Sequence, residues 1–332
     1  MLNLSEDRKN KVLVTGGAGF IGSHLSNALV AQGYEVHILD NLSSGKLENV
    51  PTGATLHTGD IRSLDLLDSL FSEHCFPFVF HEAAQMSVIR SVENPIHDAS
   101  VNILGLVTLL HTMSKHGRGK VIFASSGGVI YGEPTEIPQT EDHDLTPMSP
   151  YGIAKKTSEE YLRYYWEVHQ MPYVALRYAN VYGPKQNPLS GAGVIAIFME
   201  KILNGQAPII NGNGAKTRDY VHVSDVISAN LKAMKYDGVG SFNIGTSIET
   251  SVATLFHMIK DIAQVDLSEV YGEDKSGEQL RSALDFSKAK RFLDWEPKIK
   301  FADGLKDTVE WYLDSIKTKR LEVQEKVTEN TV

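Results

Sequence analysis

The stretch Thr15-Gly16-Gly17-Ala18-Gly19-Phe20-Ile21-Gly22-Ser23-His24 decides the fold of this chain. It follows an apolar run that predicts a strand over 11–15, and it opens a segment that predicts a helix over 21–32. A glycine turn between a strand and a helix is typical of a dinucleotide site, because Gly16 and Gly19 let the backbone approach a pyrophosphate and Gly22 lets the helix lie close to the strand. The helix N-terminus then directs unpaired N–H groups at the phosphates.

The next predicted strand, 35–40, ends in an acidic residue at the distance from the turn, about twenty residues, where a ribose-binding carboxylate is expected. Asp40 would accept hydrogen bonds from the ribose 2′-hydroxyl of NAD and would repel the 2′-phosphate of NADP. No Arg follows it directly, since the next residue is Asn41. These features predict NAD as the cofactor, and the alternative is a solvated Asp that caps a turn.

Length, charge and cysteine count narrow the class of protein. The chain has 332 residues and a formal net charge of -9, so it can hold one large or two interlocked domains. It lacks the Lys/Arg blocks of nucleic-acid-binding proteins, and we expect no nucleic-acid partner. The single cysteine, Cys75, excludes an internal disulfide and a thiolate metal cluster, and we expect no metal. No apolar run has membrane-spanning length and residues 1–10 lack a signal-peptide core, so we expect a cytoplasmic protein with no membrane partner.

Strand-like and helix-like segments alternate through the first half of the chain, which predicts an α/β fold with a Rossmann-type doubly wound parallel sheet. After Tyr178, glycines and prolines interrupt the pattern and indicate a smaller, mixed C-terminal region. The predicted strands are 11–15, 35–40, 54–58, 77–82, 120–125, 172–177 and 239–245, and the predicted helices are 21–32, 63–74, 97–116 and 150–169. We expect an NAD-binding domain over 1–178 with a returning segment near 219–246, a substrate-binding region over 179–218 and 247–316, and a disordered tail over 317–332.

Tyr151 and Lys155 form a candidate proton-transfer pair. Ser149-Pro150 predicts a helix start, so the two residues lie one turn apart on one face of the helix. A cation beside a phenol favours the ionised form that a base needs. A Tyr/Lys pair alone is more often a solvated contact, and the chain has a second pair with this spacing at Tyr271 and Lys275.

The predicted strand 120–125 brings two serines to its carboxyl end, where ligands bind in open α/β sheets. A hydroxyl of Ser125 or Ser126 can position a substrate hydroxyl against Tyr151. The alternative is a Ser/Gly turn that only closes the strand. These serines favour a catalytic role for Tyr151 over a solvated contact.

Further motifs follow in order along the chain. They are Asp60-Ile61, His81-Glu82-Ala83-Ala84, Asn102, Arg177-Tyr178-Ala179-Asn180-Val181-Tyr182-Gly183-Pro184 and Arg218-Asp219-Tyr220-Val221-His222-Val223. With the glycine turn, Asp40, the two serines and the Tyr/Lys pair, the chain resembles the extended short-chain dehydrogenase/reductase family over residues 11–315. Within that family it is similar to the nucleotide-sugar 4-epimerases of the UDP-glucose and UDP-N-acetylglucosamine type.

The resemblance implies where NAD would bind. Asp60 and Ile61 would hold the adenine, and Asn102 and Tyr178 would lie at the nicotinamide end. His81 and His222 are expected to be structural. The full set of implied NAD-binding residues is Gly16, Gly19, Phe20, Ile21, Gly22, Asp40, Asn41, Asp60, Ile61, Ala83, Ala84, Gln85, Asn102, Ser125, Tyr151, Lys155 and Tyr178.

The resemblance also implies a UDP-sugar site. Asn180 and Arg218 would bind the diphosphate, because an Arg fork suits phosphate oxygens. Ser282 would border the C2 substituent of the sugar, and a small residue there leaves room for an N-acetyl group. The other implied substrate-binding residues are Val194, Pro208 and Ile210 at the uracil and its ribose, and Lys275 and Glu278 in place of the Arg and Asp of the family's Arg-x-Gly-Asp.

One catalytic position departs from the family pattern. The Ser or Thr of the family's catalytic triad lies four residues before Tyr131, where this chain has Gly127. Ser126 is the first substitute, Ser125 is the second, and Ser87 is the third.

The implied reaction is NAD-dependent 4-epimerisation of a UDP-sugar through a transient 4-keto sugar, with Tyr151 as acid and base. UDP-N-acetylglucosamine would be accepted as well as, or instead of, UDP-glucose. The alternatives are another nucleotide-sugar epimerase, such as one for UDP-glucuronate, a dehydratase or decarboxylase, and a non-catalytic NAD-binding protein. Gly128 and Val129 argue against elimination or decarboxylation, because the relatives that perform these reactions carry an acid there.

The same resemblance implies a homodimer. The segments 97–116 and 152–169 form helices that pair two subunits in many members of the family. Their apolar faces could equally belong to the core of a single subunit.

Overall fold

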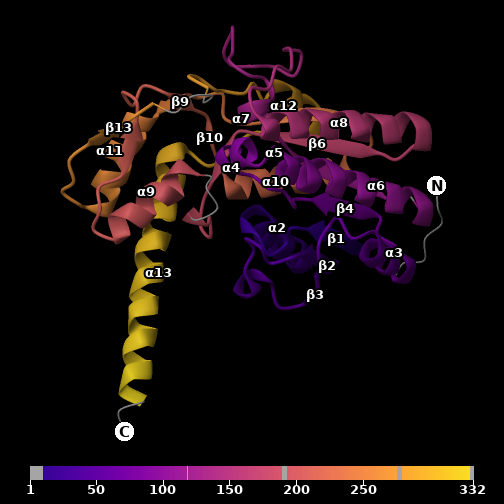
Figure 1. The fold of residues 1–332 in the computed structure, drawn as a ribbon, viewed down its shortest axis with the longest axis horizontal. Helices are drawn as coiled ribbons and strands as arrows, with labels where there is room; N and C mark the ends of the chain where they lie inside the picture. The colour runs from indigo at the N-terminus through magenta and orange to yellow at the C-terminus, as the bar shows by residue number, and fades with distance from the viewer. Residues whose placement is uncertain (1–9, 118, 189–192, 275–278, 330–332) are drawn as a thin grey trace.

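A seven-stranded parallel sheet forms the centre of the molecule in the computed structural model, which describes residues 10–117, 119–188, 193–274 and 279–329. The strand order is β11-β6-β5-β4-β1-β2-β3 (Figure 1). The strands are β1 Lys11–Thr15, β2 Glu35–Asp40, β3 Ala54–Thr58, β4 Phe78–His81, β5 Lys120–Ser126, β6 Tyr173–Tyr178 and β11 Gly240–Ile244. All seven coincide with predicted strands, so the predicted doubly wound α/β fold is confirmed.

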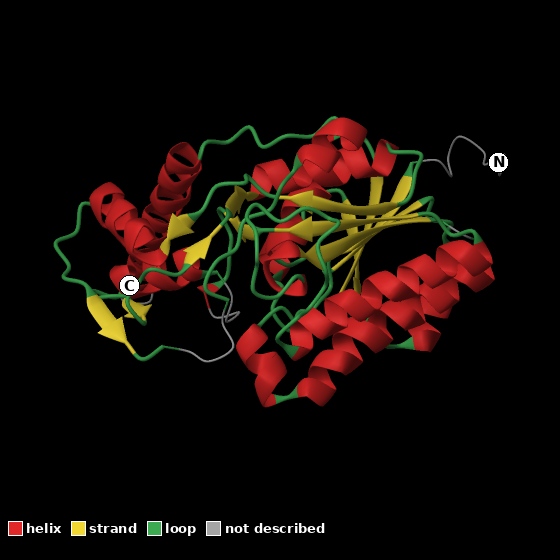
Figure 2. Ribbon diagram, turned by 90° about the horizontal axis from the view of Figure 1, so that it is seen from above, coloured by secondary structure: helices red, strands yellow, loops and turns green. Residues whose placement is uncertain are grey.

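Helices cover both faces of the sheet (Figure 2). On one face, α2 (Phe20–Ala31) packs against α10 (Val223–Lys235) and buries Leu25 and Leu29, which lie one helical turn apart. On the other face lie α3 (Leu64–Glu73), α6 (Gly105–His116) and α8 (Pro150–His169), and they enclose a second apolar cluster. The central strands read as continuous apolar runs because both of their faces are buried.

The strand order reverses at β1, which lies between β2 and β4. Ligands of open α/β sheets bind at such a point, outside the carboxyl ends of the strands. The glycine turn follows β1 at this edge, and the ends of β2, β4, β5 and β6 meet it there because all these strands run in parallel. The fold therefore collects the candidate site residues from five strands at one edge.

A smaller mixed region follows the sheet. Its third apolar cluster joins α9 (Val194–Leu203), α11 (Val252–Ala263) and the start of α13 (Phe301–Glu329). Its short strands are β7 Asn180–Tyr182, β8 Ile209–Asn211, β9 Thr217–Arg218, β10 Tyr220–His222, β12 Thr250–Ser251 and β13 Val270–Gly272. The strand pairs β10–β7 and β12–β9 bring Asn180 and Arg218 toward the carboxyl edge of the main sheet.

The structure also shows elements that the sequence pattern did not predict. They include η1 Leu47–Asn49, α4 Val88–Glu93, α7 Gly127–Ile130 and α12 Ser287–Leu293, as well as α9, α10 and α11. The predicted helix 97–116 is divided into the end of α5 (Pro95–Ala99), the π-helical η2 (Ser100–Leu104) and α6. Helix α12 and the buried Trp295 pack on the core of the main sheet rather than on the smaller region. The segment 284–295 therefore differs from its expected assignment to the substrate-binding region.

Helix α13 spans Phe301–Glu329 and extends away from the rest of the molecule (Figure 1). The tail expected to be disordered from residue 317 on is thus helical as far as residue 329. The segment 305–329 contains neither Gly nor Pro and is rich in Lys, Glu and Leu, which favour helix even where no apolar face is needed. Among the described residues, no helix is both long enough and apolar enough to cross a membrane.

Candidate active site

In the glycine turn, the backbone of the turn lies very close to the loop after β4 and to the start of α2. Gly16 has a φ of 70°, and a Cβ there would lie 2.6 Å from the backbone nitrogen of Ala83. A Cβ on Gly22 would overlap the carbonyl oxygen of Gly16. Only glycine fits at these two positions, so α2 begins directly against the turn and its first N–H groups face outward at the sheet edge. This cradle fits the pyrophosphate of a dinucleotide.

Asp40 is fixed beside that turn. Its Oδ2 accepts a hydrogen bond of 2.9 Å from the N–H of Ala18, and its Oδ1 accepts one of 2.8 Å from the N–H of Leu42. The carboxylate is almost buried at the end of β2. A carboxylate fixed next to the turn fits a ribose 2′-hydroxyl and excludes a 2′-phosphate, as predicted from the sequence.

The carboxylate of Asp60, which is expected to hold the adenine, is hydrogen-bonded to neighbouring side chains. Its carboxylate accepts a two-pronged hydrogen bond from Arg62, with distances of 2.8 and 2.7 Å, and a third bond of 3.2 Å from Asn41. The Arg62 guanidinium holds the pKa of Asp60 well below its usual range. Ile61 is buried in the cluster beneath α3 and α6, so its side chain supports this corner from inside.

Asn102 and Gln85 bind each other. Asn102 Oδ1 accepts from the N–H of Gln85 at 3.0 Å, and its amide donates to the Gln85 carbonyl at 2.9 Å. The Gln85 amide donates to Asp98 at 2.8 Å. Both side chains therefore fix the loop after β4, which carries Ala83 and Ala84, rather than reaching into the cleft.

Ser87 lies at the start of α4. Its Oγ accepts from the N–H of Arg90 and caps α4, and the residue is 1% exposed. Ser87, the third substitute for the triad hydroxyl and an expected substrate-binding residue, therefore caps a helix and does not line the cleft.

A cleft of about 740 Å³ opens at the carboxyl edge of the sheet. It brings together residues from both regions of the molecule, as the sequence predicted for many of them. The expected site residues that line it are Phe20, Ile21, Ser125, Ser126, Tyr151, Tyr178, Asn180, Val194 and Arg218. Its other walls are largely apolar, with Met86, Ile89 and Val92 from the loop after β4 and from α4.

Tyr151 and Lys155 lie one turn apart at the start of α8. Ser149 caps this helix by accepting from the N–H of Gly152 at 3.2 Å, and Pro150 is its first residue. The Lys155 Nζ lies 5.6 Å from the centre of the Tyr151 ring and donates to the Ala124 carbonyl at 2.7 Å. The predicted pair is therefore present, with its cation fixed by the end of β5.

The protein groups alone do not lower the pKa of the Tyr151 phenol. Burial raises the pKa of Tyr151 above its ordinary value, and a hydrogen bond from Ser126 opposes this rise. Burial also lowers the pKa of Lys155 to about 8. The sequence-based expectation that Lys155 would lower the pKa of Tyr151 is thus not met without a further positive charge, because burial disfavours the phenolate more strongly.

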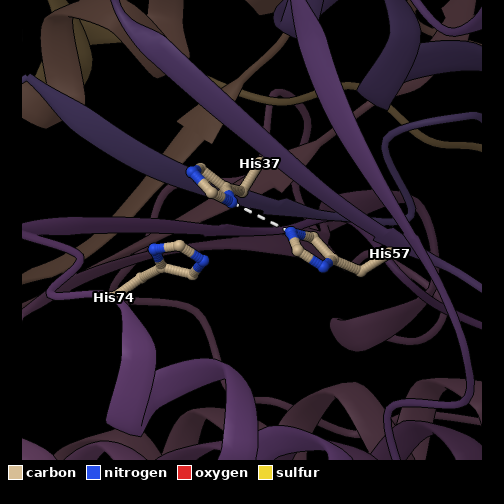
Figure 3. Close-up of side chains that lie close together, drawn as sticks. All are labelled: His37, His57 and His74. Atoms are coloured by element: carbon tan, nitrogen blue, oxygen red, sulfur yellow. Dashed lines mark hydrogen bonds between the residues drawn. The ribbon is translucent and has the colours of Figure 1, made fainter.

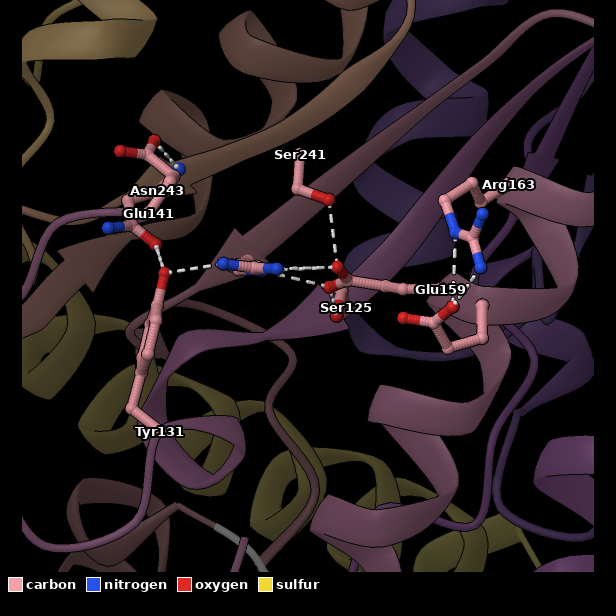
Figure 4. A network of polar contacts seen from close by, with 9 residues as sticks. Ser125, Tyr131, Glu141, Glu159, Arg163, Ser241 and Asn243 are labelled. Carbon is pink, nitrogen blue, oxygen red and sulfur yellow. Dashed lines mark hydrogen bonds and ion pairs between the residues drawn. The ribbon is translucent and has the colours of Figure 1, made fainter. Parts of the chain in front are cut away.

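The structure separates the two serines. Ser126 hydrogen-bonds to Tyr151, whereas Ser125 donates to Glu159 at 2.6 Å. Glu159 also accepts from Ser241 at 2.8 Å and forms a buried ion pair with Arg177 at 2.7 Å. Figure 4 shows how Glu159 joins Ser125 and Ser241 in this network. The geometry favours Ser126, the first substitute, over Ser125.

Glu82 is a site residue that the sequence analysis quoted within a motif without assigning it a role. Its carboxylate accepts from the Tyr178 hydroxyl at 3.1 Å, and that hydroxyl accepts from Asn230 at 2.8 Å. Burial raises the pKa of Glu82 to about 7, and its charge in turn favours the charged form of Lys155. Its position directly after β4, at the carboxyl edge, is the signal that identifies it.

On the substrate side, Asn180 stands out. Its Oδ1 is buried and has no hydrogen-bond partner among the described residues, although the residue lines the cleft. Buried amide oxygens are nearly always paired, so this atom is suited to a ligand donor. Arg218 lines the same wall and donates to the Thr217 carbonyl at 2.7 Å.

Several expected substrate contacts lie elsewhere. Ile210 packs in the core of the smaller region, and Pro208 is buried beside it, so neither lines the cleft. The β8 backbone turns the Ile210 side chain inward, which a linear motif does not reveal. Ser282 is 1% exposed and does not line the cleft, and its Oγ is buried without a partner in the described part of the chain. Lys275 and Glu278 lie outside the described residues.

The two histidines of the motifs are placed as structural residues, as expected. His81 is buried with its Nδ1 2.8 Å from the Thr15 hydroxyl, and burial lowers the pKa of His81 to about 3. His222 caps α10 and packs edge-on against Tyr182. Both rings hold elements of the fold in place.

Residues 12–245 match the model of the NAD dependent epimerase/dehydratase family. The chain belongs to that family. The resemblance drawn from the motifs is confirmed, and so are NAD as the cofactor and an enzyme of the epimerase type.

Solved structures agree with this assignment. The chain is 46% identical to UDP-glucose 4-epimerase of Thermotoga maritima, solved with UDP-glucose, with a TM-score of 0.91 over 92% of this chain and 99% of that one. It is 39% identical to UDP-glucose 4-epimerase of Thermus thermophilus, solved with NAD, with a TM-score of 0.87 over 91% and 98% of the two chains. It is 35% identical to UDP-N-acetylglucosamine 4-epimerase of Methanobrevibacter ruminantium, solved with UDP-N-acetylmuramic acid, with a TM-score of 0.85 over 92% and 99%.

The two serines give the first testable prediction. Ser126→Ala removes the donor to the Tyr151 oxygen and is expected to lower kcat by about 10²–10³, measured as sugar turnover at saturating substrate. Ser125→Ala removes one donor from Glu159 and is expected to lower the free energy of unfolding by about 1–3 kcal/mol with a much smaller effect on kcat. Equal losses of kcat in the two variants would contradict the assignment.

Glu82 gives the second prediction, on pH dependence. Burial lowers the pKa of Lys155 to about 8, and the Glu82 carboxylate counteracts part of that shift. Glu82→Gln removes the counteracting charge, so the pKa of Lys155 falls further. The basic limb of the kcat–pH profile is expected to move to lower pH, because Lys155 then loses its charge earlier.

A matched control is Glu141→Gln, which removes a half-buried carboxylate that accepts from the N–H of Asn243 and is not among the charges acting on Lys155. The basic limb of the kcat–pH profile of Glu141→Gln should lie at the same pH as that of the unmodified protein. An unchanged limb in Glu82→Gln, or an equal shift in both variants, would rule out the role of Glu82.

Proposed function

We propose that this protein interconverts the C4 epimers of UDP-sugars, and that it accepts UDP-N-acetylglucosamine as well as, or instead of, UDP-glucose. The observation that carries this proposal is a single cleft where Tyr151 and Ser126 face Asn180 and Arg218. The first two residues supply proton transfer, and the second two suit a diphosphate anchor.

Tyr151 and Ser126 have different roles in the proposed reaction. Tyr151 removes the proton of the sugar 4-hydroxyl, and Ser126, hydrogen-bonded to Tyr151, stabilises the resulting phenolate. The glycine turn and Asp40 would hold NAD, which would supply the reversible hydride chemistry at C4 and, in its oxidised form, a positive charge. Tyr151 then returns the proton to the inverted hydroxyl, so no NAD is consumed.

The walls of the cleft suit a keto sugar that must turn over between the two hydride steps. The apolar side chains of Met86, Ile89 and Val92 form few directional contacts with a sugar, so they do not fix one face of it. Arg218 and Asn180 can keep the diphosphate in place meanwhile. Gly128 and Val129, close to Ser126 in the chain, offer no acid for the elimination or decarboxylation that related enzymes perform.

The proposal includes pairing of two copies of the chain. An apolar stripe on the outer face of α8 carries Ile153, Tyr161, Tyr164 and Val168, whose spacing of three to eight residues follows one helix face. Ile153 and Val168 are 51% and 58% exposed. A patch of this kind on a helix is typical of an interface, and sedimentation equilibrium measures whether the mass in solution is that of two chains.

The main experiment follows the sugar by proton NMR. The purified protein is incubated with UDP-glucose, UDP-N-acetylglucosamine or UDP-glucuronate, and the anomeric signal of the 4-epimer is expected for the first two. Tyr151→Phe is the matched control, since it removes only the proton-transfer group, and it should lower turnover by about 10²–10⁴ while NAD binding is retained. Near-normal turnover by Tyr151→Phe would refute the mechanism, and epimerisation of UDP-glucuronate alone would refute the proposed substrates.

Ser282 provides the test of substrate size. Its side chain is small and its Oγ has no partner among the described residues, so Ser282→Ala should leave both turnover rates nearly unchanged. Ser282 itself does not line the cleft, but Gln279, three residues earlier, does. Ser282→Tyr adds a ring that the buried site cannot hold without displacing its surroundings, and this displacement would reach the cleft wall at Gln279. We expect it to reduce turnover of UDP-N-acetylglucosamine at least tenfold more than turnover of UDP-glucose, measured as kcat/KM. An equal effect on both sugars would show that Ser282 does not border the C2 substituent.

A further inference from the structure

Three histidines from separate elements meet at the β3 edge of the sheet, outside the cleft. His37 lies in β2, His57 lies in β3, and His74 directly follows α3. In the β2–β3 register His37 pairs with Thr55 and Leu39 pairs with His57, so His37 and His57 point to the same face. The end of α3 places His74 over that face, as Figure 3 shows. None of the three lines the cleft.

The distances between the rings match those of a shared ligand. His37 Nδ1 lies 2.9 Å from His57 Nε2, and one ring nitrogen from each of the three histidines lies within 4.8 Å of the other two. Two imidazole nitrogens bound to one tetrahedral zinc, at about 2.0–2.1 Å each, lie about 3.3 Å apart. Small side-chain rotations therefore convert this cluster into a three-nitrogen ligand set.

The bonds around His37 favour the ligating form of its ring. His37 Nε2 lies 3.1 Å from Glu35 Oε1, which can only accept, so Nε2 carries the proton and Nδ1 is left with a free lone pair. A histidine that binds metal through one nitrogen and donates to a carboxylate through the other is the common arrangement in metal sites. Glu35 is itself held by Lys11 at 2.9 Å.

His74 supplies a second, independent observation. Its Nδ1 is buried and has no hydrogen-bond partner in the described part of the chain. The His74 ring lies 4.3 Å from the His37 ring, centre to centre, and its place at the end of α3 aims it at the pair. A buried ring nitrogen without a hydrogen-bond partner does not fix the orientation of this imidazole, so the ring can turn either nitrogen toward the other two, where a shared ligand would satisfy it.

From these contacts we propose that His37, His57 and His74 bind one divalent transition-metal ion, and that the ion is Zn²⁺. Three imidazoles suit Zn²⁺, Co²⁺, Ni²⁺ and Cu²⁺ rather than Mg²⁺ or Ca²⁺, which prefer oxygen ligands. A water completes the four-coordinate shell. On binding, the His57 proton moves from Nε2 to Nδ1, so no net proton is released and no redox step is involved. The sequence analysis expected no metal because it considered cysteine ligands only.

The site lies apart from the catalytic cleft and ties together β2, β3 and α3. Because the ion would bind the folded chain and not the unfolded one, it would stabilise this edge of the sheet. The expected role is therefore structural, and turnover of the sugar should not depend on the ion.

The test uses the full-length protein after treatment with a chelator. Titration with Zn²⁺ by calorimetry, and with Co²⁺ by its visible absorption, is expected to show one ion per chain. Zn²⁺ should also raise the temperature of unfolding. His57→Ala and His74→Ala should each weaken Zn²⁺ binding at least tenfold, and Glu35→Gln should weaken it about tenfold through the orientation of His37.

Two controls keep the result specific. His97→Ala removes an exposed histidine elsewhere, and Cys75→Ser removes the thiol that follows His74, and neither should change the affinity. Circular dichroism establishes that each variant is folded. Absence of stoichiometric binding to the unmodified protein would overturn the proposal, and so would affinity that survives in folded His57→Ala and His74→Ala or that is lost in Cys75→Ser.

Discussion

Close backbone contact at the glycine turn is the constraint on which the rest of the structure depends. Gly22 lies against Gly16, and Gly16 lies against Ala83, so α2 and the loop after β4 meet with no side chain between them. The N–H of Gly16 also donates to the Leu39 carbonyl at 2.8 Å, which joins the turn to β2. A Cβ at either glycine would separate these elements and move every residue that the carboxyl edge positions.

A buried ion pair forms the rear wall of the site. Arg177 and Glu159 are both nearly buried, and their bond of 2.7 Å is surrounded by the hydroxyls of Ser125, Ser241 and Tyr131. Removing one partner of such a pair leaves a buried charge at a cost of about 3–5 kcal/mol. The pair therefore fixes β5 against β6 and α8, and with them the relative positions of the two serines and Tyr151.

Burial rather than a single neighbour governs the protonation of the site. It raises the pKa of Tyr151, lowers that of Lys155 to about 8, and raises that of Glu82 to about 7. All three shifts disfavour the charged form, as expected where water is excluded. A charge brought by a bound cofactor would consequently have a large effect on these groups, because charges act more strongly on buried groups than on exposed ones.

The sequence by itself determined the strands of the main sheet, the helices α2, α3, α6 and α8, the glycine turn, the carboxylate of Asp40 after β2 and the Tyr151/Lys155 pair. These features depend on local periodicity and on spacing within one element or between neighbouring ones. Only the tertiary structure decided which hydroxyl faces Tyr151. Ser125 and Ser126 are adjacent in the chain, yet the hydroxyl of Ser125 donates a hydrogen bond to Glu159, which lies 34 residues further on. It also decided that Ile210 belongs to the core, that Ser87 caps a helix, and that His37, His57 and His74 meet. Such contacts join residues distant in sequence, and their geometry follows from how sheets and helices pack, which no linear pattern records.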